Sequence, residues 1–206
     1  SSGDVARARR VLVATGLRDE LPPLTGARKR WGASVFACPY CHGHEVAGKR
    51  WAVLVSGRAV LRSARTYRSW TRDLVVLLDG RGVLDQDAAR SFREAGIAIE
   101  PRRVIALHGP GRRLTDIEVE GGERIPCEAL VVAPAQRQAE IVFTLGLALD
   151  ADGYVSANDA LETSMPGVYV CGDAAGLRQQ AVFAAADGAA AAMSIVESLT
   201  LEDLRA

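Results

Sequence analysis

The sequence predicts an α/β fold, in which buried strands alternate with helices along the chain. Short runs of aliphatic residues, such as 11–16 and 74–78, have the length and β-branched composition of buried strands. Glycine-containing turns follow several of these runs, and residues 85–96 repeat apolar side chains at helical spacing. With 206 residues and 49% hydrophobic content, the chain can bury the core of one large or two small domains.

Charge balance and the N-terminal sequence limit the classes of partner. Lys and Arg together number 25, as do Asp and Glu, so the formal net charge is zero and we expect no nucleic-acid or membrane partner. The sequence has no run of about 18 apolar residues, and its start lacks the charged and apolar regions of a signal peptide. We therefore expect a cytoplasmic protein. Because the chain does not start with methionine, we also expect a longer protein to begin upstream.

The first predicted strand, 11–16, ends with Thr15 and Gly16. Residues 17–26 contain two adjacent prolines and Gly26, and we expect them to be irregular, because proline lacks a backbone donor and glycine favours turns. A domain boundary is expected near residues 24–34.

The stretch Cys38-Pro39-Tyr40-Cys41-His42 places two thiols three residues apart, a spacing that lets a disulfide close and reopen with little backbone movement. A helix-compatible segment follows, so we expect Cys41 to lie near a helix N-terminus that would stabilise its thiolate. His42 is suited to exchange protons with a thiol near neutral pH, or else is a solvent-facing loop residue. We interpret the motif as a redox-active site.

Two other interpretations of the cysteine pair stay open. A Cys-x-x-Cys pair is half of a zinc site, but Cys127 and Cys171 are isolated, and His42 and His44 lie too close to Cys41 for the usual finger spacing. A structural disulfide is the other interpretation. We predict no metal site, and four cysteines fit a reducing compartment in which one pair cycles better than a disulfide scaffold.

Residues 49–79 predict a strand, a glycine turn, a helix to about residue 70 and a second strand, the first half of a Rossmann-like dinucleotide-binding unit. Asp79 follows Gly57 by about 20 residues, where an acidic residue would contact a ribose. Valines at 55 and 60 replace the first and third small residues of the fingerprint, which argues for weak pyrophosphate binding. Gly57 and Asp79 thus either retain nucleotide binding or belong to a purely structural unit.

The middle of the chain continues the alternation. A helix is predicted over 85–96, ended by Gly96. It is followed by predicted strands at 97–100, 104–108, 115–120 and 125–134.

From residue 139 the pattern changes. Residues 141–159 predict an irregular return, and 166–173 predict a turn and a strand that ends in Gly172 and Asp173. A long alanine-rich helix is predicted over 178–199. Asp173 could accept a sugar hydroxyl while the helix N-terminus faces an electron-rich oxygen, or it could simply cap the helix.

These pieces together resemble the low-molecular-weight thioredoxin reductase family of FAD-dependent pyridine-nucleotide disulfide oxidoreductases, over almost the whole chain. The cysteine pair stands at the family's redox site, and Ala-Thr-Gly at 14–16 looks like its first crossover. Residues 53–64 stand where its second nucleotide fingerprint lies. Gly172-Asp173, the segment 178–181 and Asp187-Gly188 look like its C-terminal flavin-binding strand and helix.

The resemblance implies an α/β architecture with a Rossmann-like, three-layer central domain inserted in a partial FAD-binding domain. Residues 1–26 and 134–206 would form the FAD-domain portions, and 27–133 the NAD(P)-binding-like domain that carries the cysteines. FAD is the implied cofactor, and NAD(P)H is left open, with Gly57 and Asp79 as its candidate contacts. The implied FAD contacts are Thr15, Gly16, Gly172, Asp173, Gln179, Gln180 and Ala181.

The resemblance also implies roles at the cysteine pair. Cys41 would react with the flavin, Cys38 would exchange with the substrate, and His42 would donate or accept the proton where thioredoxin reductases carry an acid. Two departures stand out: the family's first glycine-rich fingerprint is absent, and 79–81, Asp-Gly-Arg, replaces its basic stretch for the NADP 2′-phosphate. At the cysteine motif the chain resembles more closely a sub-branch of dithiol oxidases, which form disulfides in small molecules by using oxygen.

We therefore predict an FAD-dependent thiol–disulfide oxidoreductase of the dithiol oxidase type, acting as a homodimer on a small dithiol or disulfide or on a thioredoxin-like protein. An NAD(P)H-dependent disulfide reductase is the alternative among enzymes. Outside enzymes, the alternative is a non-catalytic remnant that binds a partner.

Overall fold

The protein, described by a computed structural model, divides into two compact units. The structure describes residues 3, 5–54, 66–81 and 84–205. Unit 1 comprises Ser1–Glu20 and Gln136–Ala206, and unit 2 comprises Leu21–Ala135. The chain therefore leaves unit 1 once and returns once. The sequence placed these two boundaries after residues 26 and 133, six residues and two residues away from where the structure divides.

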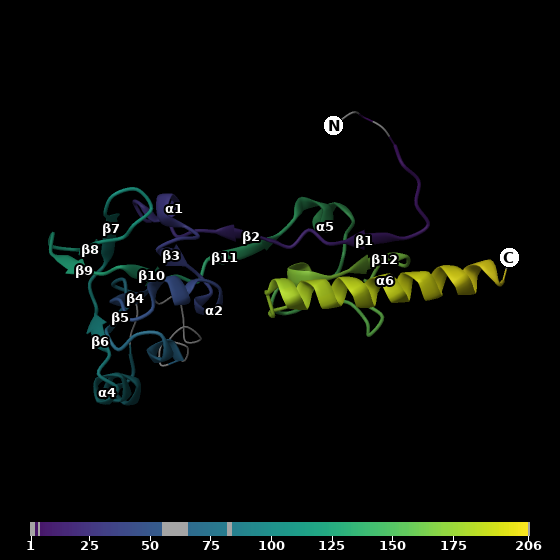
Figure 1. Ribbon diagram of the computed structural model, residues 1–206. Coiled ribbons are helices and arrows are strands. Elements are labelled where there is room, and N and C mark those ends of the chain that lie inside the picture. Colours follow the sequence, from purple (N-terminus) through teal and green to yellow (C-terminus); the bar gives the residue numbers. More distant parts are fainter. Residues whose placement is uncertain (1–2, 4, 55–65, 82–83, 206) are drawn as a thin grey trace. The chain divides into compact units, whose positions relative to one another are not determined.

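A five-stranded parallel sheet forms the centre of unit 2 (Figure 1). Its strands are short and aliphatic, as expected for strands buried on both faces. In spatial order they are β3 (Val35–Phe36), β10 (Ala129–Val131), β4 (Trp51–Leu54), β5 (Leu74–Leu77) and β6 (Ala98–Glu100).

Alternate residues of this sheet enter two separate cores, so unit 2 has three layers. Ala52 and Leu54 pack on one face against an antiparallel sheet of β7 (Val104–His108), β8 (Asp116–Val119) and β9 (Arg124–Pro126). Trp51 and Val53 pack on the other face, together with Phe92 of helix α4 (Gln86–Glu94) and Tyr67 of the 3-10 turn η2 (Tyr67–Ser69). This confirms the predicted Rossmann-like, three-layer class.

The parallel arrangement brings the loops after the strands to one edge of the sheet. Cys38 lies two residues after β3, and Asp79 lies two residues after β5. Since β10 and β4 lie between these strands, three spacings of about 4.8 Å separate β3 from β5, or about 14 Å. The carboxyl edge of a parallel sheet is where open α/β folds bind ligands.

Unit 1 contains the other sheets and the longest helix. Strands β1 (Val11–Val13) and β12 (Val168–Val170) pair in parallel, and their core includes Val142 and Ala174. Val142 belongs to helix α5 (Glu140–Thr144), and Ala174 to the 3-10 turn η3 (Gly172–Ala175). Helix α6 (Ala181–Asp203) follows, and strands β2 (Leu17–Glu20) and β11 (Ala135–Gln138) form a separate two-stranded pair.

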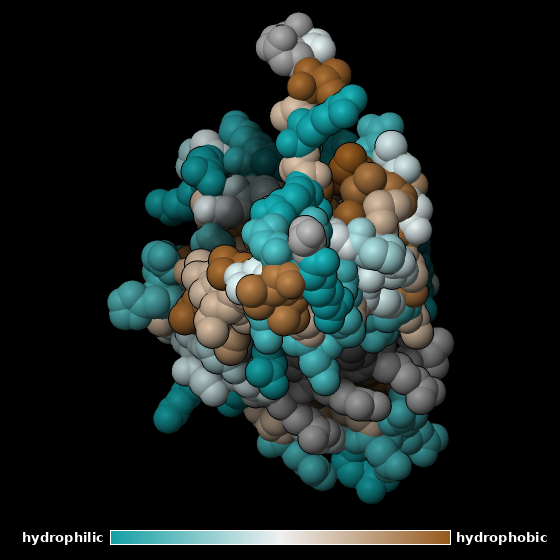
Figure 2. Space-filling model, turned by 90° about the vertical axis from the view of Figure 1, so that its right-hand side faces the viewer, coloured by the Kyte–Doolittle hydropathy of each residue, from teal (hydrophilic) through white to brown (hydrophobic). Residues whose placement is uncertain are grey.

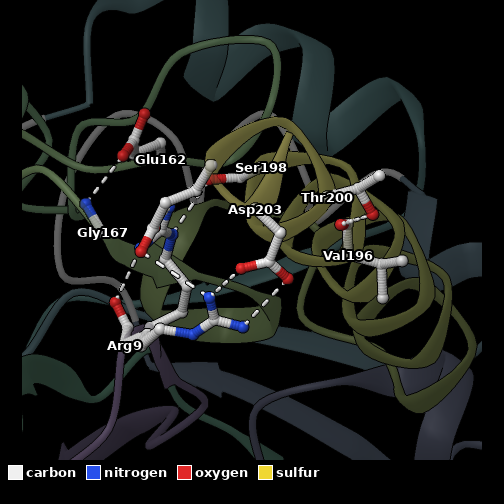
Figure 3. A network of polar contacts seen from close by, with 9 residues as sticks. Arg9, Glu162, Gly167, Val196, Ser198, Thr200 and Asp203 are labelled. Atoms are coloured by element: carbon white, nitrogen blue, oxygen red, sulfur yellow. Dashed lines mark hydrogen bonds and ion pairs between the residues drawn. The ribbon is translucent and has the colours of Figure 1, made fainter. Parts of the chain in front are cut away.

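Two arginines tie the start of β1 to the end of α6 (Figure 3). Arg9 pairs with Asp203, and Arg10 pairs with Glu202 and donates to the Ser198 hydroxyl at 2.9 Å. Exposed ion pairs of this kind contribute little to stability, because water and salt screen them. The contacts fix the strand at one end of the helix.

Most of α6 is exposed, including apolar side chains. Figure 2, seen from the side on which the C-terminus lies in Figure 1, shows apolar residues among hydrophilic ones on that face. Among the described residues, α6 is the one helix with the length and mean hydropathy, 1.4, that a membrane span would need, which by itself is weak evidence. Its large exposed apolar side chains are Val182, Phe183, Met193, Val196 and Leu201.

Several element predictions were wrong, and two of them failed because a strand pairs with a partner that lies elsewhere in the chain. Residues 17–20 form β2 rather than irregular structure, because β11 supplies a partner strand. The predicted strand 125–134 is two strands, since β9 pairs with β8 and β10 joins the parallel sheet. Helix α5 lies in the segment expected to be irregular, and α6 starts at Ala181 because Gln180 is extended. The predicted helix after residue 56 lies mostly outside the described residues.

Candidate active site

The sulfur atoms of Cys38 and Cys41 lie 2.7 Å apart, with the Cys41 thiol donating a hydrogen bond to Cys38. A one-turn helix, α2 (Pro39–His42), creates this proximity. Cys38 immediately precedes it in an extended conformation, and Pro39 at its first position is preset for helical φ. Both thiols are free, Cys41 is exposed and Cys38 is half-buried. A covalent S–S bond is about 2.05 Å long, so the pair can form one with a small movement.

The electrostatics of Cys41 differ from the expectation. Cys38, not Cys41, stands at the N-terminus of α2, and Cys41 is the third of its four residues. The hydrogen bond to Cys38 raises the pKa of Cys41 to about 11, and burial adds to this effect. The prediction of a helix-stabilised Cys41 thiolate was therefore wrong for the dithiol state. Cys38 is the acceptor of this bond, and the raised pKa favours the thiol form of Cys41.

His42 is packed rather than free in a loop. Its imidazole stacks on the Phe36 ring, with centroids 5.6 Å apart and planes at 18°. The ring is half-buried, and Nδ1 is buried without a hydrogen-bond partner. The backbone N–H of His42 donates to the carbonyl of Cys38, the residue that precedes α2, at 3.2 Å and so closes the turn of this helix.

A row of aromatic rings supports the motif, and the sequence analysis did not identify it. Phe36 meets Trp51 edge to face at 5.5 Å, Trp51 stacks with Trp70 at 6.3 Å, and Trp70 meets Tyr40 edge to face at 5.1 Å. Tyr40 itself is 70% exposed. Phe36 lies in β3, Trp51 in β4 and Tyr40 in α2, and Trp70 follows η2. Only the fold brings these four rings together. The one signal in the sequence was Trp51 and Trp70, one at the start of a predicted strand and one shortly before the next.

Gly43 lets the end of α2 approach this row. A Cβ atom at Gly43 would lie 2.4 Å from the Pro39 carbonyl oxygen and 2.6 Å from the Trp70 ring. Such distances are shorter than real contacts, so a larger residue would displace either the helix or the ring. The glycine therefore matters for its lack of a side chain, since its φ of −67° is ordinary.

Unit 1 contains a separate hollow of about 370 Å³ where β12 leads into α6. Gly172, at φ 67°, approaches α6 so closely that a Cβ there would lie 3.2 Å from the Ala184 Cβ. Asp173 has no hydrogen-bond or ion-pair partner among the described residues, and Gln180 does not cap α6 with its side chain. The hollow is lined by Ala14, Gly16, Cys171, Gly172, Asp173, Gln179, Gln180, Ala181 and Ala184.

These features fit part of a flavin. A free carboxylate accepts hydroxyl groups such as those of a ribityl chain, and the uncapped N–H groups of a long helix favour an electron-rich carbonyl. Thr15 and Gly16 line an adjoining hollow of about 510 Å³. Gly16 borders both hollows, so the structure brings together six of the seven residues expected to contact FAD, and Thr15 joins them through Gly16.

The amide of Gln179 is already engaged within unit 1. It exchanges two hydrogen bonds of 2.8 Å with the Gln136 amide, and its nitrogen lies 3.4 Å from the Tyr154 hydroxyl oxygen. Gln179 therefore shapes the hollow through its backbone and through this pair. Gln136 and Tyr154 were not predicted, because neither lies in a recognisable motif.

The predicted nucleotide contacts of unit 2 are only partly described. Gly57 lies outside the described residues, as do the two valines of the altered fingerprint. Asp79 has a positive φ of 52°, and its carboxylate accepts the Val104 N–H at 2.8 Å. One oxygen of Asp79 therefore holds the start of β7. Among the described residues, no group of three or more His, Cys, Asp or Glu side chains could hold a metal ion.

The amino-acid sequence is similar to a known protein family and to several known proteins. A family model described as pyridine nucleotide-disulphide oxidoreductase matches residues 1–188. Thioredoxin reductase sirT of Leptosphaeria maculans is 27% identical over 209 residues, which cover 94% of this chain and 64% of that protein. The thioredoxin reductase of Borreliella burgdorferi is also 27% identical, over 93% of this chain and 61% of its own length.

Solved structures resemble the fold. The crystal structure of HlmI matches with a TM-score of 0.88 at 33% identity, covering 95% of this chain and 62% of that one. A putative thioredoxin reductase TrxB from Bacillus anthracis matches with a TM-score of 0.87 at 28% identity, covering 94% and 66%. The chain thus spans just under two thirds of the length of these relatives.

Proposed function

Because the chain belongs to the pyridine nucleotide-disulphide oxidoreductase family, we propose that it carries the thiol–disulfide exchange site of an FAD-dependent disulfide oxidoreductase of the dithiol oxidase type. The observation that carries this proposal is the pair of free sulfurs, Cys38 and Cys41, 2.7 Å apart on one turn of helix. The free Asp173 carboxylate and the uncapped α6 N-terminus support FAD as its cofactor.

In the oxidising direction, a substrate thiolate attacks the Cys38 sulfur of the Cys38–Cys41 disulfide. The S–S bond breaks, a mixed disulfide forms with Cys38, and the electron pair leaves with Cys41, which takes a proton. The second thiolate of the substrate then attacks the first substrate sulfur, which is bonded to Cys38. This step forms the substrate disulfide and releases Cys38, which takes the second proton. The substrate leaves as a disulfide, and the protein keeps the dithiol.

The chain's residues suit these steps. In the dithiol, the hydrogen bond to Cys38 raises the pKa of Cys41, which favours the protonated product of the exchange. Cys38 accepts that bond, which suits the sulfur that exchanges with substrate. Bound FAD supplies the two-electron acceptor that returns the dithiol to the disulfide, with oxygen as the final oxidant.

A reductase is the second candidate, favoured by the names of the relatives, which are thioredoxin reductases. It would run the same exchange in reverse, with NAD(P)H as the electron source and a disulfide substrate. Its NAD(P)H site would involve Gly57 near the pyrophosphate and Asp79 near a ribose. The Val104 N–H engages one Asp79 oxygen, and the second oxygen is the one that would accept a ribose hydroxyl there.

One experiment tests the proposal and separates the two directions. The protein is reconstituted with FAD and mixed either with a small dithiol in air or with NADH or NADPH and a disulfide. We expect oxygen consumption and peroxide from the first mixture and slow nicotinamide oxidation in the second. Cys38→Ser should abolish the activity, while Cys127→Ala, a buried cysteine away from the pair, should keep it. Rapid nicotinamide oxidation would favour the reductase, and no turnover in either mixture would favour a non-catalytic binding protein.

Two expectations from the sequence remain predictions, namely a homodimer and a cytoplasmic location. Sedimentation of the purified protein would test the first. Fractionation of the producing cells would test the second.

A further inference from the structure

Gln138, the last residue of β11, is a buried amide that donates two hydrogen bonds within unit 1. Its side chain is 7% exposed. The amide nitrogen donates to the Gly153 carbonyl oxygen at 3.0 Å and to the Ala174 carbonyl oxygen at 2.9 Å. Because backbone carbonyls only accept, these two partners fix which end of the amide is the nitrogen. The amide oxygen, Oε1, is buried without a partner in the described part of the chain, so Gln138 acts through its two N–H groups.

The bond to Ala174 is not needed to satisfy that carbonyl group. The Ala174 oxygen also accepts the backbone N–H of Val155 at 2.9 Å, and a carbonyl oxygen has two lone pairs. An oxygen held from two directions cannot move without losing one of the two bonds. Ala174 is fully buried and belongs to η3, so Gln138 and Val155 together fix this turn.

The same turn carries Asp173, which directly precedes Ala174 and lines the hollow of about 370 Å³. Among the described residues, no hydrogen bond or ion pair holds the Asp173 carboxylate. Its direction therefore depends on the backbone of η3. A group that is already oriented before the ligand arrives binds more tightly, because less ordering has to occur on binding.

We propose that Gln138 is a positioning residue of the flavin site, which orients the Asp173 carboxylate by holding the Ala174 carbonyl. The proposal rests on the proposed function for the identity of the ligand. Gln138 also lines the adjoining hollow of about 510 Å³, so direct contact with the ligand is the rival explanation. The two explanations differ in whether the effect of Gln138 requires Asp173.

A double-mutant cycle on FAD affinity separates them. The parent, Gln138→Met, Asp173→Ala and the double variant are titrated with FAD and followed by flavin fluorescence. Methionine is also unbranched but offers no donor. We expect Gln138→Met to bind FAD about tenfold more weakly than the parent, as for residues coupled in one network. In the Asp173→Ala background the same change should alter affinity by less than about twofold.

Three results of this cycle would contradict the account. An equal loss from Gln138→Met in both backgrounds would mean that Gln138 acts independently of Asp173, which overturns the proposal. No loss in Gln138→Met would overturn it as well. If Asp173→Ala bound FAD as tightly as the parent, the assignment of this hollow to flavin, and with it the proposed cofactor site, would be wrong.

Hydrogen exchange of the FAD-free protein, followed by mass spectrometry, tests the positioning itself. In Gln138→Met the amides of η3 and of Val155 should exchange faster, while those of β1 and β12 keep the parent rates. Thr163→Val is the matched control, because Thr163 is also buried in unit 1 but its hydroxyl bonds the backbone of Met165. It should leave the exchange of η3 and the FAD affinity unchanged. Faster exchange throughout unit 1 in Gln138→Met, or equal changes in both variants, would indicate general destabilisation and overturn the proposal.

Discussion

The Cys41 thiol donates to the Cys38 sulfur across 2.7 Å, and this bond is the largest cause of the raised pKa of Cys41. It also ties the pKa of one cysteine to the presence of the other, which makes the relationship measurable.

Replacing Cys38 should lower the pKa of Cys41. The hydrogen bond to Cys38 is the largest cause that raises this pKa to about 11, and a free cysteine has a pKa of about 8.5. In Cys38→Ala, alkylation of Cys41 at neutral pH should speed up by about tenfold for each unit of pKa lost. The rate as a function of pH gives the pKa, and Cys127→Ala serves as the control. An unchanged Cys41 profile would show that the bond is absent in solution.

Filling the space at Gly43 should destabilise unit 2. Gly43→Ala places a Cβ against the Pro39 carbonyl and the Trp70 ring, and overpacking of this kind costs about 1–3 kcal/mol. All three tryptophans lie in unit 2, so their fluorescence during urea unfolding reports on this unit. The control is Gly176→Ala, where nothing lies within 4 Å and φ is extended. Equal unfolding midpoints for the two variants would mean that α2 shifts to accommodate the added methyl group without lowering the free energy of unfolding.

Stability at high pH should depend on Cys127. Burial raises the pKa of its thiol from 9.0 to about 12. Because the folded pKa is the higher one, the stability that this group contributes is complete below about pH 9 and is lost as the pH rises toward 12. Cys127→Ala removes this dependence, so its free energy of unfolding should fall less over that range than the parent's. Parallel curves for both proteins, followed by tryptophan fluorescence, would contradict the assignment.

Removing the Asp173 carboxylate should weaken FAD binding. A hydrogen bond to a charged group contributes about 1.5–3 kcal/mol, and about 1.4 kcal/mol corresponds to tenfold in affinity. Asp173→Ala should therefore bind FAD about 10- to 100-fold more weakly in a fluorescence titration. Asp159→Ala, an exposed aspartate of the same unit, is the control. Equal affinities for both variants would place the flavin elsewhere.

Helices and strands that carry their own capping residues or aliphatic runs could be predicted from the local sequence. The helix near 85–96 was predicted because Asp85 caps α4 by accepting the Ala88 N–H and Gly96 follows its end. The strands 104–108 and 74–78 were predicted within one residue because their aliphatic runs are buried on the sheet. Strands β2 and β11 are mostly polar, and each becomes a strand only because the other lies beside it, so no local pattern marked them.

In the candidate site, too, features set by neighbouring residues could be predicted and features set by distant residues could not. The spacing of Cys38 and Cys41 predicted their proximity, since one turn of helix is enough to bring them together. The packing of His42 could not be predicted, because the ring that stacks on it, Phe36, belongs to one strand and is itself held by Trp51 of another. The direction of the Cys41 pKa was wrong for a related reason. It depends on a hydrogen bond whose donor only the structure shows.

The central claim is that Cys38 and Cys41 cycle between dithiol and disulfide, and disulfide mapping tests it most directly. The FAD-loaded protein is reduced, exposed to air, alkylated under native conditions and digested, and the cysteine peptides are identified by mass spectrometry. The account predicts that Cys38 and Cys41 are alkylated first before oxidation and are joined to each other after it. Cys127 and Cys171, which are buried, should remain thiols throughout. A pair that stays reduced in air, or faster alkylation of Cys127 and Cys171 in the native protein, would contradict the account.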